Sequence, residues 1–220
     1  MLYIVVGIIS LALWMLYYYL SKLTEKYIVK DNKTLYYFVP LIAAFIPTLV
    51  VLIIRNSWRL HLDTIADLEY WGLILLAIVI SSTLTIVFSP STNKVEPMEL
   101  SMRCLHGGFM EVPERVMLQN FTLLMLMSFN IQAKYSVLIS SIVIALGIII
   151  DAILRKDKDY RSITVKVISS LIFSLLVGHV YYFSGCIIYC IVGHILERFI
   201  SNIFYIRKKI VSDSEYDYQE

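Results

Sequence analysis

Three charged residues stand close together at the start of a long apolar run. Glu111, Glu114 and Arg115 are spaced i, i+3 and i+4, so a helix would place them along one flank. Carboxylates beside a guanidinium can take up a proton or hold a reacting water molecule. An ionised side chain near the centre of a bilayer costs about 2.5–3.5 kcal/mol on insertion scales, so such a group needs a partner or a function.

A second group, His194, Glu197 and Arg198, repeats this spacing near the end of the chain. Counted along the two helices at about 1.5 Å per residue, both groups fall at a similar depth. We therefore expect the two stripes to face each other. They would form either a buried ion-pair network that locks two helices, or a wet site in which carboxylate and imidazole converge.

His179 is expected above that layer, nearer the outer face. Two interpretations of it stay open. It is a hydrogen-bonded or interface histidine beside Gly178 and the Tyr181–Tyr182 pair, or it is a supporting group of the site.

The composition indicates that membrane helices position these residues. The chain has 220 residues, of which 59% are hydrophobic and only 16% are charged, against roughly 25% charged in soluble domains. The net charge of +2 is too small and too dispersed for a nucleic-acid partner. The three cysteines form neither a disulfide framework nor a CxxC metal pair. The expected surroundings are a lipid bilayer, most simply the cell membrane.

About 20 apolar residues cross a bilayer as a helix, and the sequence predicts about seven such spans. The fold class is therefore an all-α polytopic membrane bundle. It forms one membrane-embedded domain over residues 1–210, followed by a flexible tail over 211–220. The expected spans are Leu2–Leu20, Tyr36–Ile54, Tyr70–Phe88, roughly Cys104–Phe129, Tyr135–Leu154, Ile163–Phe183 and Gly185–Ile206.

The distribution of Lys and Arg over the connections predicts the orientation. Thirteen of them fall in the connections after spans 1, 3 and 5 and in the tail, whereas three fall on the other side. Cytoplasmic loops carry the excess of these residues. The N-terminus is therefore expected outside and the C-terminus in the cytoplasm.

Pro113 stands inside the fourth expected span, two residues after Glu111. Because proline lacks a backbone N–H and clashes with the preceding turn, the helix either begins near this point or is locally open. Free backbone groups are tolerated at membrane depth only where water or protein satisfies them.

At these residues the sequence resembles the CPBP family of intramembrane proteases, which includes CAAX prenyl endopeptidases and bacteriocin-processing or immunity proteins. MEVPER, Met110 to Arg115, is similar to the Glu-Glu-x-x-x-Arg motif, with Glu111 as its second Glu. Phe183–Phe199 looks like the closing segment, with His194 as the motif histidine. The resemblance covers about the last 120 residues, with the core at 104–206.

The chain departs from the family pattern at three places. Met110 stands at the position of the first Glu, and Arg198 stands where Asn or Asp follows the motif histidine. The fifth span has no histidine for the Phe-x-x-x-His motif; Phe173 and His179 come one span later, at a longer spacing.

The resemblance implies an intramembrane endopeptidase that hydrolyses a membrane-associated peptide. Glu111 would act as the base, or Glu114 if the helix is turned, and His194 would bind the water or polarise the carbonyl group. Arg115, Glu197 and Arg198 would support these groups.

A divalent metal such as zinc stays open. A catalytic zinc has three protein ligands, and the candidates are His194, a carboxylate of the first group and His179. Two alternative functions also stay open: a non-catalytic family member that binds a hydrophobic peptide or membrane partner, and a small transporter.

Overall fold

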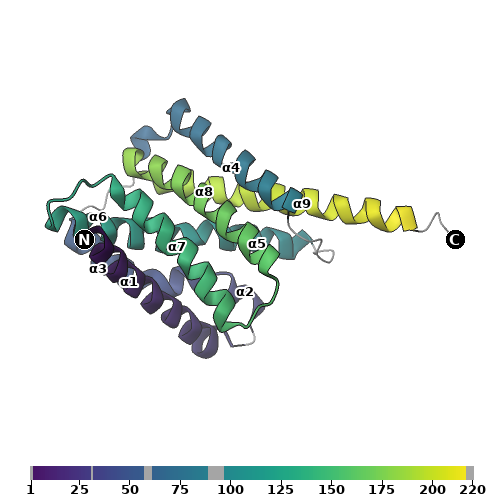
Figure 1. The fold of residues 1–220 in the computed structure, drawn as a ribbon, viewed down its shortest axis with the longest axis horizontal. Helices are drawn as coiled ribbons and strands as arrows, with labels where there is room; N and C mark the ends of the chain where they lie inside the picture. The colour runs from purple at the N-terminus through teal and green to yellow at the C-terminus, as the bar shows by residue number, and fades with distance from the viewer. Residues whose placement is uncertain (1, 31, 57–60, 89–96, 217–220) are drawn as a thin grey trace.

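The computed structural model describes residues 2–30, 32–56, 61–88 and 97–216, and these residues fold as helices without a strand (Figure 1). The long helices are α1 (Leu2–Thr24), α3 (Val39–Arg55), α4 (Leu68–Phe88), α5 (Pro97–Glu111), α6 (Asn120–Ser128), α7 (Tyr135–Leu154), α8 (Tyr160–Ser184) and α9 (Ile187–Tyr216). Shorter elements are the π-helical η1 (Glu25–Val29) and η3 (Val112–Gln119), the single turn α2 (Lys33–Tyr36) and the 3-10 turn η2 (Leu62–Thr64).

Five helical segments are long and apolar enough to cross a membrane. They are Leu2–Val29, Thr34–Arg55, Leu68–Phe88, Tyr135–Leu154 and Tyr160–Ser184. The two other expected spans correspond to the α5–η3–α6 rod and to α9, which carry the charged groups described above. The all-helical class and several membrane-compatible helices are thus present in the described part of the chain.

Element boundaries differ from the expected ones mainly around these two charged helices. α5 begins at Pro97 rather than near Cys104, because proline is well suited to the first helical turn. α9 continues to Tyr216, past the expected start of the tail at residue 211. It runs well beyond the rest of the bundle (Figure 1). The polar loop expected before α5 lies partly at 89–96, outside the described residues.

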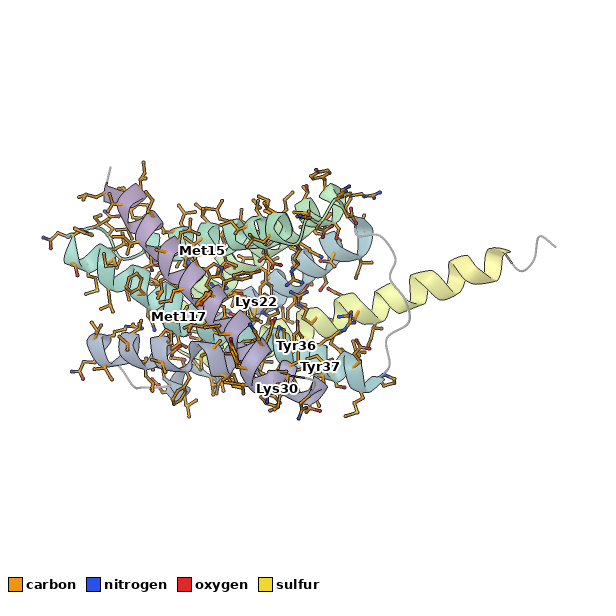
Figure 2. All side chains as sticks on the ribbon, turned by 90° about the horizontal axis from the view of Figure 1, so that it is seen from below. Met15, Lys22, Lys30, Tyr36, Tyr37 and Met117 are labelled. Atoms are coloured by element: carbon orange, nitrogen blue, oxygen red, sulfur yellow. The ribbon has the colours of Figure 1, made fainter. Side chains whose placement is uncertain are left out.

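Two apolar cores lie on either side of the central rod. One joins α4, α8 and α9 through residues such as Ile74, Val177 and Tyr189. The other joins α1, α3 and α7 to Met117 and Leu118 of η3. The labelled Met117 lies beside the path of α1 in Figure 2, where α9 again extends away from the bundle. η3 therefore passes between two packed halves.

The backbone opens into a π-helix directly after Glu111. η3 spans eight residues and has Pro113 in its first turn. Since proline cannot donate the usual hydrogen bond, the wider i→i+5 pattern lets the rod continue through this position. Of the two alternatives for Pro113, the structure shows a locally altered helix within a continuous rod. Such π segments are common at functional sites.

Candidate functional site

The side chain of Glu111 bridges α9 and the central rod. One carboxylate oxygen, Oε1, lies 2.7 Å from His194 Nδ1, and the other, Oε2, accepts from Arg115 Nε at 2.9 Å. Glu111 and Arg115 are both completely buried, and His194 is 7% exposed. The structure thus brings together Glu111, Arg115 and His194 from separate parts of the chain.

The other ring nitrogen of His194 faces the more open side of the cluster. Arg198 Nε donates to His194 Nε2 at 3.3 Å, which assigns the proton of the neutral ring to Nδ1 and leaves Nε2 as an acceptor. The Arg198 side chain is 53% exposed. The ring of Phe173 packs on the imidazole, with centroids 5.0 Å apart. The imidazole is therefore held on one face and one edge.

Gly107 allows α5 to approach α9 closely at this point. A Cβ built on Gly107 would lie 2.9 Å from Arg198 Cγ and 3.1 Å from His194 Cδ2. A side chain here would push the two helices apart. Because glycine has no side chain, the His194 imidazole can reach Glu111, which lies one turn further along the same rod.

Arg115 passes from the carboxylates to a second polar layer. Its Nη1 donates to Gln119 Oε1 at 3.4 Å, and Gln119 Nε2 donates to the Gly178 carbonyl at 2.8 Å. Its Nη2 lies 3.6 Å from Glu114 Oε2, which makes an ion pair. Arg115 is thus enclosed by protein and cannot contact a substrate, so its role is to hold Glu111 and the local helix.

Glu197 faces away from the central rod. Its Oε1 accepts from Ser81 Oγ of α4 at 3.2 Å and from Ser201 Oγ at 3.0 Å. On a helix with about 100° per residue, Glu197 lies about 60° to one side of His194 and Arg198 about 40° to the other. The expected single stripe is therefore spread around α9: Glu197 joins α9 to α4, while His194 faces Glu111. The Arg198 side chain contacts both of them, with its Nε 3.3 Å from His194 Nε2 and 3.5 Å from Glu197 Oε2.

Two further residues singled out from the sequence lie apart from this cluster. His179 is exposed on α8, and its ring lies against Phe183 with centroids 4.6 Å apart. Met110 turns toward α1, where its sulfur accepts from Tyr17 Oη at 3.5 Å. The side chain at position 110 therefore does not point at the imidazole.

Sequence reasoning missed a polar junction between α3, α6 and α8. Asn120 Nδ2 lies 3.0 Å from Tyr181 Oη, and Asn120 Oδ1 accepts from Arg55. Asn120 directly follows Gln119, so the run of polar residues that continues from η3 into α6 was the signal in the sequence for this junction. Spacing alone could not show which helices these residues meet.

The donor set does not fit a catalytic zinc, because no group of three His, Cys, Asp or Glu side chains in the described residues is arranged to hold a metal. His194 has both nitrogens engaged, and each oxygen of Glu111 already has a partner. His179 is exposed on α8 beside Phe183 and belongs to no such group in the described part of the chain. We therefore derive no step through a metal.

Comparison with protein-family models, with curated proteins and with solved structures gives no match to this chain.

Proposed function

We propose that the chain is a multi-pass membrane hydrolase that cleaves a membrane-associated peptide, with His194 as its general base and Glu111 as a positioning residue. The observation that carries this proposal is the 2.7 Å contact between Glu111 Oε1 and His194 Nδ1. A buried carboxylate that accepts from Nδ1–H fixes the ring tautomer and stabilises the imidazolium formed during proton transfer, as in serine hydrolase triads.

In the proposed membrane arrangement seven helical rods cross the bilayer with the N-terminus outside. Contacts between helix ends support this arrangement. At one end Tyr18 donates to Asp151, and His106 Nδ1 lies 3.2 Å from the carbonyl of Tyr37. The labelled Lys22 of α1 and Lys30, which directly follows η1, belong to this end (Figure 2). At the other end Tyr189 donates to the Asp67 carbonyl. Lys and Arg predominate at the first end, as expected of a cytoplasmic face.

The proposed reaction uses the lone pair at His194 Nε2. When the half-exposed Arg198 side chain moves away, a water molecule takes its place at Nε2. The water oxygen attacks the peptide carbonyl carbon while one water proton passes to Nε2. The proton is then given to the leaving amine nitrogen as the C–N bond breaks, so the products are a carboxylic acid and an amine. Arg198 is the nearest flexible cation to stabilise the oxyanion.

The burial of the two carboxylates favours His194 as the base over Glu111 or Glu114, which the motif suggested. Glu111 has no exposed surface, and both of its oxygens are occupied. It cannot reach a water molecule without giving up a buried ion pair. Glu114, whose side chain is 10% exposed, has no imidazole partner in the described residues. His194 is therefore the better base.

A second candidate function is that of a non-catalytic protein that binds a hydrophobic peptide or membrane partner. The observation that favours it is the complete enclosure of Arg115 between two carboxylates, which is what a structural lock requires. The other alternative, a small transporter, has no observation of this kind in its favour. As a proton carrier it is disfavoured, because the Arg115 guanidinium between Glu111 and Gln119 does not release its proton.

A comparison of membrane proteomes tests the proposal against this alternative. Membranes containing the wild-type protein, Glu111→Gln or Glu114→Gln are compared for the peptide termini that peptide-bond cleavage creates. Glu111→Gln also leaves Arg115 with one carboxylate partner fewer, so its fragments are counted relative to the amount of folded protein. We expect folded Glu111→Gln to lose the fragments, since changing the corresponding carboxylate in serine hydrolases costs roughly 10⁴ in kcat. Glu114→Gln should keep them. Equal fragment patterns in all three samples would favour the binding protein.

A further inference from the structure

An apolar cleft lies between α1 and α7, on the opposite side of the central rod from the α4–α8–α9 core. Its volume is about 540 Å³, within the roughly 300–1,000 Å³ typical of small-molecule sites. The lining is almost wholly apolar and includes Ile8, Leu138 and Ile142. α1 and α7 lie side by side along it (Figure 1).

The cleft has a defined end and a defined length. Tyr3 and Tyr135 meet edge to face at one end, with ring centroids 5.1 Å apart. Lys134 Nζ lies 5.7 Å from the Tyr135 ring, at the start of α7. From Tyr135 to Leu146, the last lining residue of α7, the helix rises about 16 Å. That is close to one leaflet of hydrocarbon, about 15 Å of a 30 Å core.

We infer that this cleft binds one acyl chain of an anionic phospholipid, with the phosphate group beside Lys134. Tyrosines are enriched at the membrane interface, where their rings meet the headgroups. A lysine at this level reaches toward the headgroups, and its ammonium group attracts a negatively charged phosphate group. The polar and apolar ends of the cleft therefore match the two ends of a lipid in one leaflet.

A transmembrane helix is about 10–12 Å across with its side chains, so it would enter an open cleft between two helices with only one face. A single extended hydrocarbon chain is thinner. This difference in cross-section favours lipid over a peptide segment or a second copy of the chain.

Gly7 provides a variant that fills the cleft without distorting the helix. It lines the cleft, and a Cβ built on it would have no heavy atom within 4 Å. Gly72 of α4 is a matched control, because its Cβ would also meet open space and it does not line the cleft. Each glycine is changed to phenylalanine in the full chain.

The test uses phosphatidylglycerol with a photoactivatable diazirine in its acyl chain, in phosphatidylcholine nanodiscs. We expect labelled peptides from α1 and α7 to exceed those from the exposed apolar face of α4. In Gly7→Phe this labelling should fall to the level of α4, and in Gly72→Phe it should persist. Lys134→Gln should lower labelling by phosphatidylglycerol, whose headgroup carries a net negative charge, because the attraction between the ammonium and phosphate groups is lost. It should not lower labelling by a diazirine phosphatidylcholine.

Several results would overturn the inference. Equal labelling of α1, α4 and α7 in the wild type would mean ordinary lipid contact. Unchanged labelling in a folded Gly7→Phe protein would mean that the chain lies elsewhere. If Gly7→Phe does not fold, Ile142→Trp fills the same cleft from α7, and unchanged labelling of that variant has the same meaning. If Lys134→Gln lowers labelling by both lipids equally, the phosphate group does not lie beside Lys134.

Discussion

Two Arg–Glu pairs in this protein share the i, i+4 spacing and differ in burial. Arg115 Nε lies 2.9 Å from Glu111, with both side chains 0% exposed. Arg103 Nη2 lies 2.6 Å from Glu99, with side chains 49% and 42% exposed. Removing one partner of a buried pair costs about 3–5 kcal/mol in soluble proteins, because the other charge stays buried and uncompensated. An exposed helical pair contributes only about 0.3–0.5 kcal/mol.

Arg115→Met should therefore lower the free energy of unfolding by about 3–5 kcal/mol, and Arg103→Met should leave it nearly unchanged. The assay is SDS-titrated unfolding of the purified protein in mild detergent, followed by helical circular dichroism. Glu111→Gln together with Arg115→Met should recover part of the loss, since replacing both partners removes the uncompensated charge. Equal, small effects of Arg115→Met and Arg103→Met would refute the reasoning that the central pair is desolvated and mutually dependent.

Three further predictions concern other contacts and the topology. Gly107→Val should cost about 1–3 kcal/mol of stability through overpacking. Gly72 has open space around it, so Gly72→Val should show only the change in helix propensity. Equal effects of the two substitutions would contradict the close approach of α5 and α9. Ser81→Ala should destabilise by about 1.5–3 kcal/mol because it removes a donor to the buried Glu197 carboxylate. Ser174→Ala, whose buried hydroxyl has no hydrogen-bond partner among the described residues, should be neutral or stabilising. The same unfolding titration measures both, and a reversed order would be inconsistent with the α4–α9 contact. Reporter fusions after Glu220 and in the loop at Asp157 should both report cytoplasm, and an external signal from either would overturn the orientation.

The apolar runs were sufficient to predict most helix positions. Tyr135–Leu154 was expected as a span and is the observed α7, because a run of large apolar residues between polar turns defines both ends. Boundaries were less predictable at Pro97 and Tyr216, where polar helical turns continue a helix beyond its apolar part. Hydrophobicity does not mark such turns.

Helical spacing predicted which side chains share a flank, but it did not determine their partners. His194 and Glu197 are three residues apart, yet the first meets Glu111 and the second meets Ser81. A difference of about 60° around a helix axis is enough to face another neighbour. The contact between Phe173 and His194 likewise depends on how α8 packs on α9, and no local pattern in the sequence encodes it.

The proposed catalytic role of His194 is tested most directly against His179. Both histidines lie on long helices, but His194 is buried against Glu111 and His179 is exposed on α8. Membranes containing His194→Gln or His179→Gln are compared with wild-type membranes for the peptide termini produced. We expect His194→Gln to fold and lose these termini while His179→Gln keeps them. Retention of the same termini in a folded His194→Gln protein would contradict it.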